Sequence, residues 1–146
     1  MNLEALFWIS TLTTAPLWFL MIWLPHWSWT KRIAGSPLIF LPIALLYTIN
    51  LIPIFDTVIA AFLNPSLTNL ATSISQPANA LGTWQHLLAF DLVAGYWIYH
   101  DGYKRGINRW LMTVSLLLTY LLGPLGMVVY IAARTFATQT EETPSK

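Results

Sequence analysis

Four long apolar segments place the strongest limit on what this chain can fold into. They cover residues 3–24, 37–63, 82–100 and 110–133. A helix needs about 20 apolar residues to cross the hydrocarbon core of a bilayer. A soluble domain carries about a quarter charged residues, whereas this chain of 146 residues carries 9%. The sequence therefore predicts an all-α membrane protein, with four transmembrane helices in a single domain over residues 1–133.

The polar parts of the chain carry few charges. Residues 64–83 contain no charged side chain, and Leu67, Leu70 and Ile74 recur there at helical spacing. This stretch forms either a short helix on the membrane surface or an ordinary loop. The polar residues 134–146 are expected to form a disordered tail.

A net charge of +1 provides no basic surface for nucleic acid, and the absence of Cys excludes disulfides and iron–sulfur ligation.

Basic residues predict how the chain would lie in a bilayer. Most of them follow the first and third spans, whereas the opposite side has Arg134 and Lys146. Basic loops stay on the cytoplasmic side. Both termini and the middle loop of this integral, multi-pass protein are therefore expected on the lumenal or periplasmic side. The basic residues of the two loops are Lys31, Arg32, Lys104, Arg105 and Arg109.

The third span is unusual because it carries His86 and Asp91 within its apolar run. An ionisable side chain in hydrocarbon costs at least about 2.5–3.5 kcal/mol, so such residues usually face a bundle interior and serve a function. From the helical rise, His86 would lie roughly 6 Å, Asp56 roughly 10 Å and Asp91 roughly 13 Å below the outer surface. Together they could form an acid–base set. The alternative is that each Asp bonds a neighbouring helix, and this alternative is favoured for Asp56, beside the kink expected at Pro53.

Other kinds of site find less support in the sequence. No spacing of His, Cys or carboxylates is typical of a metal site, so no metal is expected. One haem between His26 and His100 is the least favoured alternative. Gly95 could seat a flat lipid or pigment. Trp84 shares a helix face with Asp91, because the two are seven residues apart.

A pattern of polar and small residues runs from the third span into the fourth. It reads Trp84-x-His86-Leu87-Leu88-x-x-Asp91-Leu92-x-Ala94, then Asp101-Gly102 and Pro124-x-Gly126. This pattern resembles the abscisic-acid-deficient-4-like family, small multi-pass membrane proteins of plants, algae and cyanobacteria. The resemblance extends over nearly the whole chain, including a proline in the first span and a tyrosine in the second.

The resemblance implies a role in xanthophyll metabolism, in a cyanobacterial thylakoid or plasma membrane or in a plastid membrane. Plant members are tied to the formation of neoxanthin, in which an epoxide of violaxanthin opens while a neighbouring proton is lost to give an allene. This isomerisation needs an acid and a base but no redox cofactor. On this basis His86 and Asp91 are the expected catalytic residues. Trp84, Gly95 and, from its depth, Asp56 are expected to contact a bound carotenoid.

Two further functions stay open. In the first, the chain is a non-catalytic pigment-binding or assembly subunit of a photosynthetic membrane complex, in which His86 and Asp91 hold helices together or coordinate a pigment. In the second, it carries haem and transfers electrons. The expected partners are the lipid bilayer, a carotenoid or other hydrophobic ligand, and a protein partner or a second copy of the chain.

Overall fold

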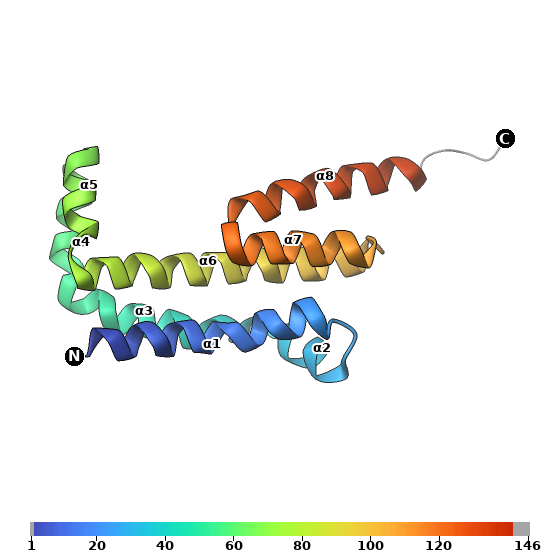
Figure 1. Cartoon of the computed structure of the whole chain (residues 1–146), viewed down its shortest axis with the longest axis horizontal. Coiled ribbons are helices and arrows are strands. Elements are labelled where there is room, and N and C mark those ends of the chain that lie inside the picture. The colour runs from blue at the N-terminus through green and yellow to red at the C-terminus, as the bar shows by residue number, and fades with distance from the viewer. Residues whose placement is uncertain (1, 142–146) are drawn as a thin grey trace. The chain divides into compact units, whose positions relative to one another are not determined.

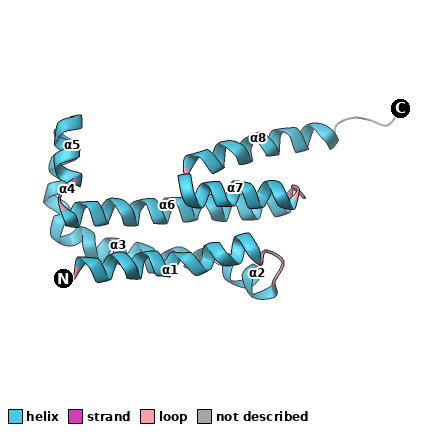
Figure 2. Ribbon diagram, viewed as in Figure 1, coloured by secondary structure: helices cyan, strands magenta, loops and turns pink. Residues whose placement is uncertain are grey.

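The chain is helical throughout the part that the structure describes. The computed structural model describes residues 2–141, and these residues form helices joined by short loops, without a strand (Figures 1 and 2). The predicted all-α class is therefore confirmed. The helices are α1 (Leu3–Trp23), α2 (Ser28–Ala34), α3 (Leu41–Leu51), α4 (Phe55–Leu63), α5 (Leu67–Ile74), α6 (Pro77–Lys104), α7 (Arg109–Leu122) and α8 (Pro124–Glu141), with 3-10 turns η1 (Pro37–Phe40) and η2 (Ile52–Ile54).

Two helical segments are long and apolar enough to cross a membrane. They are α1, with 21 residues, and the segment Pro37–Leu63, with 27 residues. Both coincide with predicted spans. Helix α6 has 28 residues and contains the third predicted span, while α7 and the apolar part of α8 are shorter. The count of four transmembrane helices therefore stays a prediction.

The chain divides into two compact units. Unit 1 comprises the residues up to 15 and residues 37–89, and unit 2 comprises residues 16–36 and those from 90 onward. Helix α1 passes from one unit to the other at Pro16, and α6 does so at Phe90. Each of these helices therefore contributes to both cores.

In unit 1, polar contacts fasten α6 to α1 and α3. The buried Gln85 donates from Nε2 to Ser10 Oγ over 2.9 Å, and Trp84 donates from Nε1 to Thr11 Oγ1 over 3.0 Å. The buried Asn50 donates from Nδ2 to the Ala78 carbonyl over 3.1 Å. Buried amides are stable only when such bonds are made, so these contacts specify the register of the helices.

The proline in the second segment has the expected effect. A proline inside a helix removes a backbone hydrogen bond and clashes with the preceding turn. Pro53 lies in η2, a 3-10 turn that separates α3 from α4. The kink predicted at Pro53 is therefore present, and it lies just before Asp56.

The polar middle loop contains the short helix that its periodicity suggested. Helix α5 covers Leu67–Ile74, and Ser66 caps it by accepting a hydrogen bond from the Asn69 backbone N–H over 3.0 Å. The cap is therefore Ser66, although Asn64 followed by proline also reads as a helix start. Helix α6 begins at Pro77 rather than near Gly82, because proline suits the first helical position.

In unit 2, aromatic side chains of α6 close over the chain that follows α1. Tyr99 donates from its hydroxyl to the Pro25 carbonyl over 2.8 Å, and His100 Nε2 bonds the Ala34 carbonyl. Gly95 receives the buried Trp18, because a Cβ at Gly95 would lie 2.5 Å from Trp18 Cη2. The glycine thus allows close packing within the core of this unit.

Helices α7 and α8 form a hairpin, which differs from the single helix expected over residues 110–133. The sequence predicts one helix over residues 110–133 with a bend, whereas the chain reverses at Gly123 and α8 returns beside α7 (Figure 1). Gly123 has φ +51° and ends α7, and Pro124 starts α8. The positive φ favours glycine. Gly126 allows the start of α8 to lie directly against α7, because a Cβ at this position would overlap the backbone of Ser115 and Thr119.

The far end of α8 is anchored to α6 through Asp101. This carboxylate pairs with Arg105 Nε at 3.0 Å and Arg134 Nε at 3.1 Å, and it accepts a hydrogen bond from the Tyr130 hydroxyl over 2.8 Å. Burial by itself would raise the pKa of Asp101, but the hydrogen bonds from Tyr130 and Arg105 and the charge of Arg134 bring it below its ordinary value. Arg134 therefore lies beside the basic loop that follows α6, whereas the sequence placed it on the opposite side.

Helix α8 also continues past the point where a tail was expected. The sequence predicts disorder from Arg134, but α8 extends to Glu141. Alanine and arginine are good helix formers, and the Asp101 contacts fix this end of the helix. Residues 142–146 of the expected tail lie outside the described residues.

Candidate functional site

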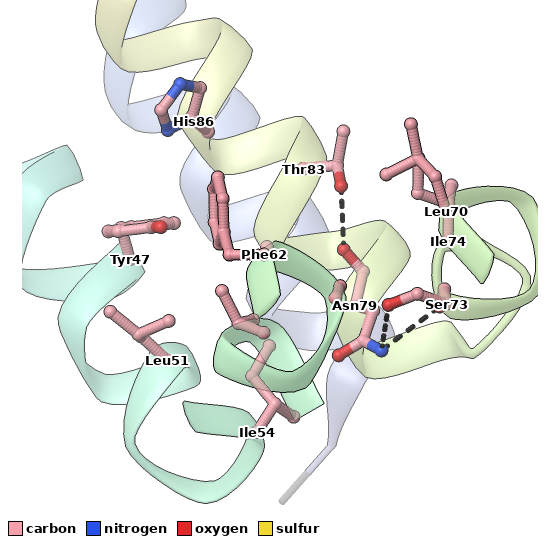
Figure 3. A pocket seen from close by; sticks show the side chains of 13 residues that line it. Tyr47, Leu51, Ile54, Phe62, Leu70, Ser73, Ile74, Asn79, Thr83 and His86 are labelled. Atoms are coloured by element: carbon pink, nitrogen blue, oxygen red, sulfur yellow. Dashed lines mark hydrogen bonds between the residues drawn. The ribbon is translucent and has the colours of Figure 1, made fainter. Parts of the chain in front are cut away.

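The candidate site is a cavity in unit 1 that is lined mainly by apolar side chains, with a few polar and aromatic ones among them. Its volume is about 380 Å³, within the range of ligand pockets. Helices α3, α4, α5 and α6 all contribute to it (Figure 3). The lining residues are Tyr47, Leu51, Ile54, Val58, Ala61, Phe62, Leu70, Ser73, Ile74, Asn79, Gly82, Thr83 and His86.

Tyr47 and His86 are the two residues lining this cavity whose side chains belong to ionisable types. Their ring centroids lie 5.9 Å apart with the planes tilted by 58°. Figure 3 shows both rings beside the same space, together with the ring of Phe62. Imidazole can gain or lose a proton near neutral pH, and a phenol can donate a hydrogen bond to an oxygen. The pair can therefore supply both an acid and a base.

The wall formed by α6 follows the helical period. Asn79, Thr83 and His86 are four and then three residues apart, so they lie on one face of the helix. Asn79 donates from Nδ2 to the Ser73 carbonyl over 3.0 Å, which ties α5 to α6. The Asn79 Oδ1 atom is buried and has no hydrogen-bond partner among the described residues. An unsatisfied buried acceptor is uncommon, so this wall retains hydrogen-bonding capacity.

Of the two predicted catalytic residues, His86 lines the cavity and Asp91 does not. Asp91 lies in the part of α6 that belongs to unit 2. Its Oδ1 atom would be 2.8 Å from a Cβ placed on Gly123, so its carboxylate packs against the turn just before α8. The N-terminus of a helix favours negative charge. This position therefore also suits a structural role at the hairpin.

The predicted substrate contacts lie elsewhere as well. The ring of Trp84 packs against Phe7, with centroids 5.6 Å apart, and bonds Thr11. The space beside Gly95 is occupied by the ring of Trp18 from the same unit. Asp56 is exposed in the first turn of α4 and is not among the cavity residues. None of these three residues contributes to the cavity around His86, and their roles as carotenoid contacts stay predictions.

The structure adds Tyr47, Asn79 and Thr83 to the candidate site. Tyr47 lies in a different helix from His86, and sequence spacing cannot show that two helices bring their side chains together. Asn79 and Thr83 could have been found, since Pro77 is a good first residue for a helix. Extending the third span back to Pro77 would have put both on the His86 face.

The structure gives no support to metal or haem ligation by the described residues. Within residues 2–136 no group of three His or carboxylate side chains could hold a metal ion. The two histidines considered for haem are each engaged in unit 2. His100 bonds the Ala34 carbonyl, and the Tyr103 hydroxyl lies 3.1 Å from His26 Nδ1.

The helical architecture, the two apolar segments and the ligand-sized cavity together define a small helical protein with candidate membrane spans. The chain belongs to the ABA4-like family, described as ABA DEFICIENT 4-like, which matches residues 5–130. This match confirms the resemblance expected from the sequence. No curated protein and no solved structure matches the chain.

Proposed function

We propose that the chain binds the oxygenated end ring of a xanthophyll in the cavity around His86 and isomerises its epoxide to an allene, as in neoxanthin synthesis. Membership of the ABA4-like family links the chain to neoxanthin and abscisic acid biosynthesis. The observation that carries the specific proposal is the pairing of Tyr47 with His86 in an otherwise largely apolar cavity. The proposed setting is a photosynthetic membrane.

The cavity has the chemistry that a xanthophyll end ring requires. The aliphatic and aromatic side chains of Leu51, Ile54 and Phe62 suit an alkylated ring. Hydroxyl and epoxide oxygens on such a ring would need hydrogen-bond donors, because polar atoms buried without partners cost free energy. Tyr47 lines the same cavity, and its phenol hydroxyl can donate to such an oxygen. Thr83 Oγ1 already donates to the Asn79 carbonyl over 3.0 Å, so it can only accept a hydrogen bond from a ligand hydroxyl.

The reaction divides between two side chains. In the proposed step, Tyr47 transfers its hydroxyl proton to the epoxide oxygen while one C–O bond breaks, so that oxygen becomes a hydroxyl and Tyr47 a phenolate. His86 removes the proton from the neighbouring polyene carbon, and the electrons of that C–H bond form the second double bond of the allene. Atoms and charge balance once His86 returns a proton to the phenolate, directly or through solvent. No oxidant or reductant takes part.

The test uses the purified full-length chain in neutral detergent with added violaxanthin. The expected result is retained carotenoid absorption bands and the appearance of neoxanthin on chromatography. Retained pigment without product would contradict the isomerase function and favour the non-catalytic, pigment-binding one. A Soret band would favour the haem protein, and a colourless sample without product would overturn both carotenoid functions.

The proposed membrane arrangement has three crossings followed by a hairpin. Helix α1, the segment Pro37–Leu63 and α6 would cross, and α7 and α8 would enter and leave on one side. Because Arg134 is paired with Asp101, the end of α8 joins the basic loops on the cytoplasmic side. The proposal thus puts the end of α8 on the cytoplasmic side, whereas the sequence-based expectation had this end of the chain on the lumenal side.

Single cysteines should reveal this arrangement, because the natural chain contains none. We expect Lys104→Cys and Thr135→Cys to react with an impermeant maleimide from the same side of sealed vesicles. Thr68→Cys, in α5, should react from the other side. Labelling of Thr135→Cys together with Thr68→Cys would restore four crossings and exclude the hairpin.

A further inference from the structure

A second cavity lies within unit 2 and has no part in the proposed isomerisation. Its volume is about 260 Å³, and it is lined by residues from the end of α1, the end of α6 and the start of α7. Buried Met21, Met112 and Leu116 contribute apolar lining. His26, Tyr103 and Arg109 contribute polar lining. The cavity thus combines an apolar wall with a group of hydrogen-bond donors.

The three polar residues lie close together. The Tyr103 hydroxyl is 3.1 Å from His26 Nδ1, and the two rings meet edge to face with centroids 5.3 Å apart. Arg109, the first residue of α7, lines the same cavity as Tyr103 and His26. An anion in the cavity would meet a guanidinium and a phenol together.

The charge of Arg109 is not balanced by the described part of the chain. The carboxylate of Asp101 pairs with Arg105 and Arg134, and Arg109 makes no ion pair with any described residue. Lys104 and Arg105 add further positive charge to the same loop. A guanidinium binds phosphate and similar oxyanions through paired N–H donors. The unbalanced charge thus favours an anionic ligand.

We propose that this cavity binds the anionic headgroup of a membrane lipid, a phosphate or sulfonate, with Arg109 as its ion-pair partner and Tyr103 as a second donor, the Tyr103 oxygen accepting from His26 Nδ1–H. The apolar part of the lipid would contact Met21 and Met112. Basic pockets between helices on the cytoplasmic side of a membrane suit anionic lipids. The cavity lies beside the loop that the positive-inside rule places on that side.

The experiment measures lipid-dependent stability of the full chain in neutral detergent. A ligand that binds only the folded state raises the unfolding temperature with its concentration. We expect dioleoyl phosphatidylglycerol to stabilise the chain more than dioleoyl phosphatidylcholine does. Arg109→Gln should weaken phosphatidylglycerol binding about tenfold. Arg32→Gln is the matched control, because it removes one exposed positive charge of the same unit that does not line the cavity.

Each outcome decides the proposal. Equal weakening by Arg109→Gln and Arg32→Gln, or no preference for phosphatidylglycerol, would overturn it. Stabilisation by inorganic phosphate alone at the same concentration would make the ligand a free anion and exclude the lipid. If Arg109→Gln does not fold, Tyr103→Phe removes one donor and keeps the ring. That variant should then bind phosphatidylglycerol more weakly than the wild type does, and wild-type stabilisation by this lipid would contradict the proposal.

Discussion

Replacing His86 by Gln is expected to lower xanthophyll isomerisation at least about 100-fold while the chain stays folded. A positioned acid or base contributes typically about 10²–10⁴-fold, and His86 is the imidazole that lines the cavity of unit 1. Gln can still form hydrogen bonds but cannot exchange a proton near neutral pH. The rate is measured as neoxanthin formed per amount of purified chain, and folding is checked by thermal unfolding.

A pair of tyrosine variants provides the control for this prediction. Tyr47→Phe removes the hydroxyl and keeps a ring beside His86, so turnover should fall while pigment binding persists. Tyr120→Phe removes the same group from a ring that packs on Trp18 in unit 2, and turnover should not change. Wild-type turnover in His86→Gln would exclude His86 as the proton carrier. Equal losses in the two tyrosine variants would exclude a specific role for Tyr47.

Replacing Gly126 by Leu is expected to open the hairpin and to destabilise the chain by about 3 kcal/mol or more. Adding bulk to a close-packed contact usually costs about 1–3 kcal/mol. Here the obstacles include the backbone of Ser115 and Thr119, which cannot move aside as a flexible side chain would. The unfolding temperature in neutral detergent should therefore fall sharply, and phosphatidylglycerol should not restore it fully.

The control for Gly126→Leu adds the same volume where there is room. Ala132 is exposed on α8, so Ala132→Leu should change the unfolding temperature little. Gly126→Ala adds a single methyl group and should give an intermediate loss. A chain with Gly126→Leu that unfolds at the wild-type temperature would show that α7 and α8 do not pack as the structure describes.

Apolar length and proline position were enough to predict most helices but not their arrangement. Residues 3–24 and 37–63 read correctly as helical segments, and Pro53 marked the break between α3 and α4. The hairpin was missed because residues 110–133 are apolar across Gly123, and hydropathy cannot distinguish a bend from a reversal. The positive φ of Gly123 and the contact at Gly126 depend on tertiary packing.

The candidate site was predictable only where a polar residue is conspicuous within an apolar run. His86 and Asp91 were both found in this way. In the structure, however, His86 lines the cavity of unit 1, whereas Asp91 packs against Gly123 in unit 2. Tyr47 entered the sequence analysis only as a tyrosine of the second span, and because tyrosine is common in membrane helices near interfaces, this did not indicate that it would lie beside His86. Asp91→Asn tests what remains of the original assignment. Lost turnover at normal stability would make Asp91 catalytic, and lost stability would assign it to the α8 terminus.

The shortness of α7 has a consequence for the surrounding lipid. Its 14 residues span roughly 21 Å, whereas hydrocarbon is about 30 Å thick. In the proposed arrangement the tip at Gly123 would end within the membrane, and acyl chains of the far leaflet would have to bend around it. Mismatch of this kind sorts proteins among membranes of different thickness. The chain should therefore partition preferentially into thin bilayers.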